Sequence, residues 1–276
     1  MTSPAASPAG AMPLVRTLGD GELLLLVHGG GMNSAAWMPA MRRLKASFRC
    51  VAPDLTAGAD AASYGDRLDA AGRQLEAVVQ SVRPADAPLH MAAHSYGGAV
   101  VADWLSSGAV AVTSLVLIEP TMPGLLAPRG QDEALAEMRA IYERCHQLVH
   151  QGDTGAAAET WISYWGGEGF WRQLPDSIRQ QTADWLASLR REYWEASFDA
   201  RWSLERLARC AARTLVLCGD ASPLPCRRTS EIVAEALGSE LRIMEGGIGH
   251  MSPLTHPNVV AERLEAALPG KRPEDA

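Results

Sequence analysis

The 276-residue sequence has no apolar run that approaches the roughly 18 residues a helix needs to cross a bilayer. Its longest candidate, Leu23–Val27, has only the length of a strand. Met1–Met12 lacks the basic and apolar regions of a signal peptide, and we expect a disordered tail there. Lys and Arg number 25 against 32 Asp and Glu, which gives a net charge of −7. This balance argues against nucleic acid or an anionic membrane as a partner.

Cysteine is scarce, with five residues, an odd number, and no CxxC spacing. Cys50 and Cys218 lie within apolar strand patterns, where we expect buried thiols. These features favour a reduced, cytoplasmic setting. The sequence also lacks a Cys/His ligand cluster, a phosphate-binding lysine loop and a G-x-G-x-x-G turn after a strand. We therefore expect neither a metal nor an organic cofactor.

Short apolar segments alternate with helical patterns along the chain. Most segments lack strict polar alternation, as expected for parallel strands that are buried on both faces. Between them, apolar residues recur every three or four positions from Leu68 to Val82, and similarly in Ala99–Ser107 and Val259–Ala267. This alternation predicts an α/β fold with a mostly parallel, doubly wound sheet. The predicted strands are Leu23–Val27, Arg49–Ala52, Leu89–Ala93, Ser114–Ile118, Thr214–Cys218 and Leu241–Met244.

The alternation stops between Thr121 and Leu207, where the pattern is helical. This stretch carries six of the eight Trp residues, namely Trp161, Trp165, Trp171, Trp185, Trp194 and Trp202. A helical insertion after a strand is where an α/β protein builds a cap over its site. We expect a core formed by residues 13–120 and 208–276, and a Trp-rich helical cap formed by residues 121–207.

The segment Leu89–Ala99 predicts a strand that runs through a sharp turn into a helix, with Ser95 at the turn. The usual pattern for such a turn is G-x-S-x-G, and Ala93 replaces its first glycine. Ala93 and Gly97 are small enough to let the strand and the helix approach closely. A serine in this position is exposed at a helix amino terminus above the sheet, so Ser95 is the candidate nucleophile.

A glycine-rich loop follows the first predicted strand, with the sequence His28-Gly-Gly-Gly, and Trp37 lies nine positions after His28. Glycine lets the backbone bend so that an N–H group points at a substrate oxygen. We expect the backbone amides of Gly30 and Tyr96 to form an oxyanion hole. Near the other end, Glu245–Met251 places a single histidine, His250, after several glycines and past the last predicted strand. His250 is the candidate base.

Three elements occur in the order and at the spacings of one superfamily. They are HG-x(7)-W from His28, A-H-S-Y-G-G around Ser95 and G-x-G-H-M around His250. On these elements the chain resembles the α/β-hydrolase superfamily from Leu23 to Leu268. Its members include esterases, lactonases, thioesterases, C–C bond hydrolases, lyases and non-enzymatic receptors. Members with a carboxylate nucleophile are disfavoured because the elbow carries a serine.

Two carboxylates compete for the role of the triad acid, which orients the histidine. In most of the superfamily an Asp lies three residues beyond a Gly after the penultimate strand. Here that position is Ser222, and Asp220 comes two residues too early. Glu119 ends an otherwise apolar strand 24 residues after Ser95. This position resembles that of the acid in haloalkane dehalogenases and zearalenone-type lactone hydrolases, so we favour Glu119 over Asp220.

The sequence thus predicts a serine hydrolase that cleaves a small or medium apolar ester or lactone through an acyl-enzyme. The alternatives are a thioesterase, a C–C bond hydrolase or a biosynthetic cyclase on the same site, and a binding protein that has lost turnover. The intact pair of Ser95 and His250 argues against the binding protein. A homo-oligomer is compatible with the sequence, which does not specify a subunit number.

Overall fold

The structure is a computed structural model that describes residues 12–55, 63–108, 110–167, 169–211 and 213–269. These residues form one seven-stranded sheet of order β1-β3-β2-β4-β5-β6-β7. Neighbouring strands are parallel except β1, which runs antiparallel to β3. The prediction of a mostly parallel α/β sheet is confirmed. The strands are β1 (Val15–Leu18), β2 (Glu22–Val27), β3 (Phe48–Pro53), β4 (Leu89–His94), β5 (Ser114–Ile118), β6 (Thr214–Gly219) and β7 (Glu240–Met244).

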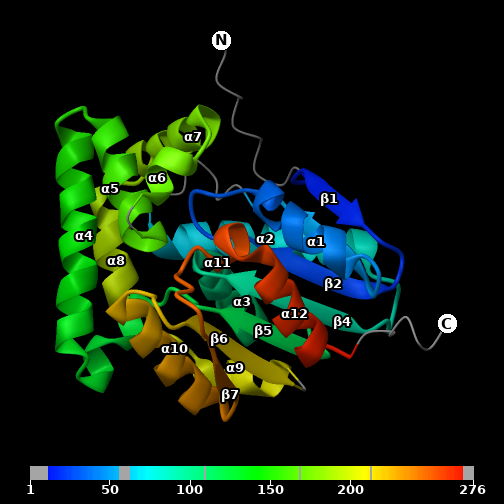
Figure 1. The fold of residues 1–276 in the computed structure, drawn as a ribbon. Coiled ribbons are helices and arrows are strands. Elements are labelled where there is room, and N and C mark those ends of the chain that lie inside the picture. Colours follow the sequence, from blue (N-terminus) through cyan, green and yellow to red (C-terminus); the bar gives the residue numbers. More distant parts are fainter. Residues whose placement is uncertain (1–11, 56–62, 109, 168, 212, 270–276) are drawn as a thin grey trace.

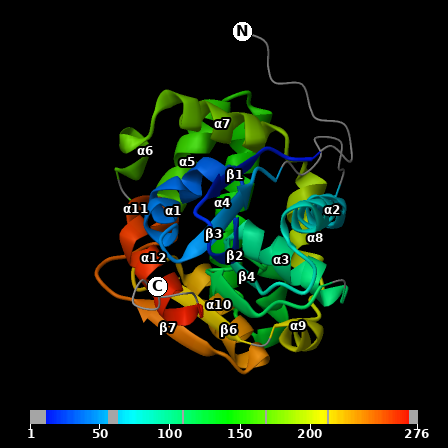
Figure 2. The same ribbon diagram turned by 90° about the vertical axis from the view of Figure 1, so that its right-hand side faces the viewer.

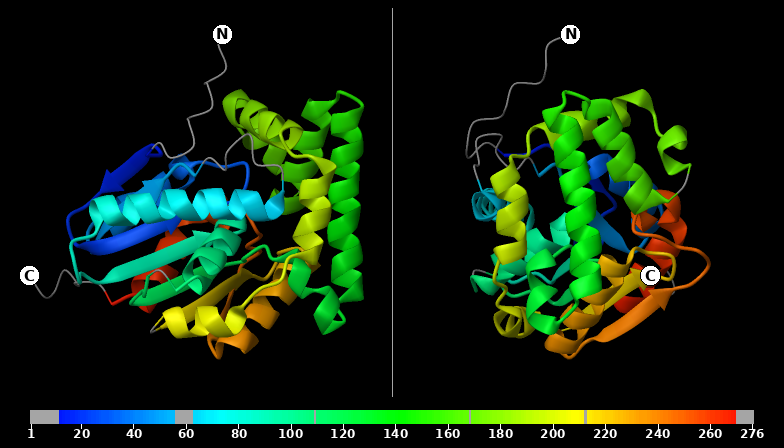
Figure 3. Two further views of the ribbon diagram at one scale, coloured as in Figure 1. Left: turned by 180° about the vertical axis from the view of Figure 1, so that it is seen from behind. Right: turned by 90° about the vertical axis from the view of Figure 1, so that its left-hand side faces the viewer.

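Helices cover both faces of the sheet, as Figure 2 shows with the strands between the two layers. On one face lie α1 (Met38–Leu44) and α12 (Pro257–Ala267), which share an apolar core with alternate residues of the strands. On the other lie α2 (Tyr64–Val82), α3 (Tyr96–Ser106) and α10 (Leu224–Leu237). Seen from behind, α2 and α3 run across the sheet in cyan and green (Figure 3). This double cover explains why β4 and β5 are buried at every residue.

Helix α2 illustrates how the sequence sets an element. Ser63 and Asp66 form a reciprocal capping box that satisfies free N–H groups of the first turn. The helix therefore begins at Tyr64, four residues before the first residue of the apolar pattern. The buried residues Leu68, Ala71, Leu75, Val78 and Val79 then form the face that packs on the sheet.

The segment between β5 and β6 forms a group of helices at one end of the sheet (Figure 1). These helices are α4 (Asp132–His150), α5 (Thr154–Gly166), α6 (Phe170–Gln173), α7 (Asp176–Ala187) and α8 (Arg191–Asp199), preceded by the 3-10 turns η2 (Pro123–Leu125) and η3 (Ala127–Arg129). Helix α9 (Leu204–Cys210) packs against α3 and α10. The predicted cap boundary at Leu207 therefore falls inside a helix that lies on the core.

Three short elements complete the description, namely η1 (Ser34–Trp37) after β2, α11 (Ser252–Thr255) after β7, and the strand β1. Sequence reasoning missed β1 because its four residues are mostly half-buried and carry no strong apolar pattern. The predicted tail lies outside the described residues, except for Met12. Within the described ranges, no helix has both the length and the apolar character needed to cross a bilayer.

Candidate active site

Ser95 lies in the turn between β4 and α3, with φ 55° and ψ −125°. A positive φ is unfavourable for a residue with a side chain and persists only where the surroundings enforce it. Here the Ser95 N–H donates to the Ile118 carbonyl at 3.0 Å, and the Ser95 carbonyl accepts from the Gly98 N–H at 2.9 Å. A methyl group on Gly97 would collide with the His28 carbonyl, which explains the small residue after the turn.

The structure brings three of the predicted residues into one hydrogen-bonded chain. His250 Nε2 lies 2.9 Å from Ser95 Oγ, and His250 Nδ1 lies 2.8 Å from Glu119 Oε2. His250 and Glu119 are both buried, whereas Ser95 is half-buried and faces a pocket. The carboxylate in contact with His250 is thus the one at the end of β5.

Glu119 is fully buried and its other carboxylate oxygen has two donors. The Gly219 N–H donates to Oε1 at 2.7 Å, and the Ser222 hydroxyl donates to the same atom at 2.6 Å. Burial acts to raise the pKa of Glu119, but the contacts with His250, Ser222 and Gly219 outweigh it and hold the pKa below its usual value. The carboxylate is therefore ionised at neutral pH, as an acid that orients an imidazole must be.

Asp220 occupies a different place. Its carboxylate accepts the backbone N–H groups of Gly246, Gly247 and Ile248 at 2.9, 3.2 and 2.8 Å. It is exposed and holds the loop that precedes His250. Ser222, which occupies the usual position of the acid, instead donates to Glu119.

Gly30 and Tyr96, the predicted oxyanion donors, both line the pocket beside Ser95. Tyr96 is the first residue of α3, where backbone N–H groups have no partner within the helix. The loop after β2 passes directly beside the serine, since a methyl group on Gly29 would lie 3.1 Å from Ser95 Cβ. The two amides are thus near the serine, and their role as oxyanion donors stays a prediction.

Two neighbours of His250 were not singled out from the sequence as parts of the site. His94 Nε2 donates to the His250 carbonyl at 2.8 Å, and the two rings lie 4.8 Å apart. Burial, followed by repulsion from His250, lowers the pKa of His94 to about 3, so this ring is neutral at neutral pH. In the sequence, His94 stands only as the second residue of the A-H-S-Y-G-G element.

The other neighbour is Cys226, whose thiol lies 3.2 Å from His250 Nδ1. Burial raises the pKa of this thiol well above its ordinary value. Cys226, Glu119 and His250 offer potential metal-ligand atoms within 4.8 Å of one another. Two of these residues already bind each other, so a metal would have to displace the proton between them. Cys226 comes from α10, and no local sequence signal places it here.

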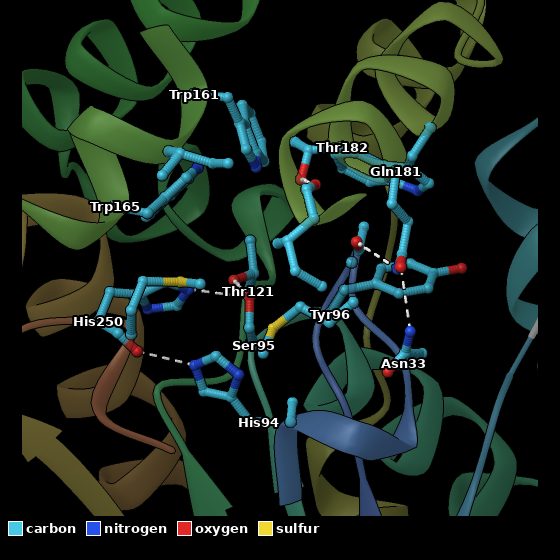
Figure 4. Close-up of a pocket in the computed structure, with 18 of the residues that line it drawn as sticks. Asn33, His94, Ser95, Tyr96, Thr121, Trp161, Trp165, Gln181, Thr182 and His250 are labelled. Carbon is cyan, nitrogen blue, oxygen red and sulfur yellow. Dashed lines mark hydrogen bonds between the residues drawn. The ribbon is translucent and has the colours of Figure 1, made fainter. Parts of the chain in front are cut away.

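The pocket in front of Ser95 has a volume of about 240 Å³. Among the described residues that line it, none is Asp, Glu, Lys or Arg. Its upper wall comes from the helices between β5 and β6, and Figure 4 shows Trp161 and Trp165 pointing in from this side. The Trp165 ring lies 4.6 Å from the His250 ring. The Trp residues that line the pocket are Trp161, Trp165, Trp185 and Trp194.

Helix α7 is fastened to the glycine-rich loop. Gln181 Nε2 donates to the Gly31 carbonyl at 3.1 Å, and Asn33 Nδ2 donates to Gln181 Oε1 at 3.0 Å (Figure 4). The Trp185 ring covers the same loop so closely that a methyl group on Gly30 would lie 2.9 Å from it. These contacts connect the helical segment to the loop that carries one predicted oxyanion donor.

Comparison with known proteins agrees with this architecture. A sequence profile described as the alpha/beta hydrolase family matches residues 24–263. The chain therefore belongs to the alpha/beta hydrolase family, as its motifs indicated. A search of curated proteins found no match.

Several solved structures share the fold at low sequence identity. A thermophilic esterase from Thermogutta terrifontis is 20% identical, with a TM-score of 0.67 over 92% of this chain and 91% of that chain. The carboxylesterase CesB (YbfK) from Bacillus subtilis is 18% identical, with a TM-score of 0.65 over 92% of this chain and 87% of that chain. Est816, an N-acyl homoserine lactone degrading enzyme, is 16% identical, with a TM-score of 0.67 over 95% of this chain and 99% of that chain. Two of these neighbours are named as esterases and the third as a lactone degrading enzyme, and at these identities they show the fold alone.

Proposed function

We propose that the chain is a serine hydrolase that cleaves a carboxylic ester or lactone through an acyl-enzyme. The observation that carries the proposal is the continuous line of contacts from Ser95 Oγ through both ring nitrogens of His250 to Glu119. A nucleophile, a base and an orienting acid in this arrangement are what acyl transfer requires. A binding protein of the same fold has no need of them.

In the proposed reaction, Ser95 Oγ attacks the substrate carbonyl carbon while its proton passes to His250 Nε2. The ionised Glu119 accepts the Nδ1–H and stabilises the imidazolium that forms. The negative charge moves to the carbonyl oxygen, where the Gly30 and Tyr96 amides would bind it. Collapse expels the alcohol, which takes the proton from His250 and leaves Ser95 acylated.

Deacylation repeats these steps with water. His250 removes a proton from water, the hydroxyl attacks the acyl carbon, and Ser95 Oγ leaves with the proton that His250 returns. With a lactone, the alcohol and the acyl group belong to the same molecule, so the freed hydroxyl stays joined to the acyl-enzyme and deacylation releases one product, a hydroxy acid.

The pocket supports a neutral, apolar substrate. Desolvating a charged group costs free energy unless a partner of opposite charge compensates it, and the part of the lining that the structure describes includes no Asp, Glu, Lys or Arg. The lactone is included because the acid follows β5, a position that resembles the zearalenone-type lactone hydrolases. We also propose a reducing, cytoplasmic location, with which the five free thiols are compatible.

The test is hydrolysis of a panel of aryl esters, lactones and acyl thioesters, together with labelling by a fluorophosphonate probe. We expect labelling of the wild type, none of Ser95→Ala, and the fastest turnover with neutral esters or lactones. The Ser95 side chain faces the pocket, so Ser95→Ala should fold normally. A wild-type protein that neither labels nor hydrolyses any ester would refute the proposal, and a preference for thioesters would reassign the substrate class.

A further inference from the structure

Thr121 is a second side-chain partner of Ser95, in addition to His250. Its hydroxyl oxygen, Oγ1, lies 3.1 Å from Ser95 Oγ. Its backbone N–H also donates to the Ser95 carbonyl at 3.1 Å. Thr121 is half-buried and lines the same pocket, where Figure 4 shows it beside Ser95. The nucleophile is thus held at both its backbone and its side chain by one residue.

The direction of the hydroxyl contact follows from the rest of the chain of hydrogen bonds. Glu119 is ionised, so His250 Nδ1 carries the proton that faces it, and to act as the base His250 must present a lone pair at Nε2. Ser95 must then donate its only proton to Nε2, 2.9 Å away. Its oxygen can meet Thr121 only as an acceptor, so the Thr121 hydroxyl is the donor.

One tripeptide therefore reaches both ends of the predicted triad. Glu119 orients His250, and Thr121, two residues later, orients Ser95. Glu119 has a φ of 46°, which is unfavourable for a residue with a side chain. Pro120 packs closely on Gly98, since a methyl group added to Gly98 would lie 2.8 Å from Pro120 Cβ. The tight turn at the end of β5 thus fixes the spacing between the two contacts.

We propose that Thr121 is a positioning residue that donates a hydrogen bond to Ser95 Oγ and keeps the serine hydroxyl directed at His250. This inference rests on the proposed function. Ser95 Oγ is the nucleophile in acylation and the leaving atom in deacylation, so loss of the donor should slow both stages. Thr121 makes these contacts without substrate, so the effect should fall on kcat and leave KM nearly unchanged.

The decisive comparison is Thr121→Val with Thr121→Ser. Valine keeps the branched shape and the backbone N–H but has no hydroxyl, whereas serine keeps the hydroxyl. One neutral hydrogen bond corresponds to about a tenfold change, so we expect kcat and the rate of fluorophosphonate labelling to fall about tenfold in Thr121→Val. Thr121→Ser should stay within about threefold of the wild type.

Thr255→Val is the matched control. Thr255 is exposed, is not among the described residues that line the pocket, and donates its hydroxyl to the Met251 carbonyl, so this variant should keep the wild-type labelling rate. Thr121→Ala, a second variant without the hydroxyl, and thermal unfolding of each protein separate a folding defect from a loss of positioning.

Equal labelling rates for wild type and Thr121→Val would overturn the inference about Thr121, and so would a Thr121→Ser variant as slow as Thr121→Val. Either result leaves the proposed function intact if Ser95 still labels, whereas failure of the wild type to label would overturn the proposed function itself.

Discussion

Replacement of Glu119 by Gln is the sharpest test of the predicted acid, because its surroundings determine how the new amide must lie. The Gly219 N–H and the Ser222 hydroxyl both donate to Oε1, so the amide oxygen has to take that place. The amide NH₂ then replaces Oε2 and faces His250 Nδ1 at about 2.8 Å. A donor at this point forces the histidine proton onto Nε2. With that proton in place, Nε2 has no lone pair facing Ser95 and cannot accept the serine proton.

The wrong tautomer in a serine protease with the corresponding Asp→Asn change lowers kcat by about 10⁴-fold, and we expect a similar loss in Glu119→Gln. The assay is initial-rate hydrolysis of a p-nitrophenyl ester, with circular dichroism to confirm folding. Asp220→Asn is the matched control: it also removes one carboxylate charge, but from a residue that holds a loop and does not contact His250, so it should lose far less activity. If Glu119→Gln keeps its rate within tenfold, or if Asp220→Asn is the more damaged variant, the assignment of Glu119 as the triad acid is wrong.

Three further predictions concern the site and its surroundings. Ser95→Ala and His250→Ala should each abolish ester hydrolysis, and the double variant should be barely worse than either, whereas multiplicative losses would show that the two residues act independently. The pKa of His94 is lowered to about 3 in the folded protein, so below about pH 6.5 the unfolded chain binds a proton that the folded protein does not. The free energy of unfolding should therefore fall by up to about 1.4 kcal/mol per pH unit as the pH drops below about 6.5. Urea unfolding at pH 7 and pH 5 should therefore show a smaller loss in His94→Gln than in the wild type, and equal losses would contradict the shift. Trp161→Ala should enlarge the pocket and raise kcat/KM for bulky esters relative to acetates, and an unchanged ranking with a lower Tm would mean that Trp161 only packs.

Local patterns were enough to predict strands β2 to β7 and to select Ser95 and His250, but they missed β1. Ser95 and His250 were identifiable because each follows a buried strand within a glycine-containing turn, a signal confined to a few neighbouring residues. The choice of Glu119 depended on a carboxylate at the end of an otherwise apolar strand, on Ser222 in the usual position of the acid, and on the resemblance to superfamily members that carry the acid after this strand. Such a carboxylate needs a partner when it is buried, and the carboxyl ends of parallel strands lie at one edge of the sheet.

The remaining parts of the site depend on packing between distant segments, which local patterns do not encode. Cys226 reaches His250 from α10, and Ser222 reaches Glu119 across 103 positions of sequence. Ser222 occupies the usual position of the acid, and its contact with Glu119 depends on the pairing of β5 with β6. The sequence predicts a Trp-rich helical segment, but which of its rings face the pocket is decided by how α5, α7 and α8 pack on one another.

The attachment of α7 to the glycine-rich loop limits which substitutions α7 can accept during evolution. Gln181 and Trp185 are four residues apart, so they share one face of the helix and meet Gly31 and Gly30 together. A substitution at either position would change the shape of the pocket and the support of the loop at once. Selection for a new substrate is therefore easier at Trp161, which lines the pocket from α5 without forming this attachment. A cap transplanted from a relative would have to bring both residues with it.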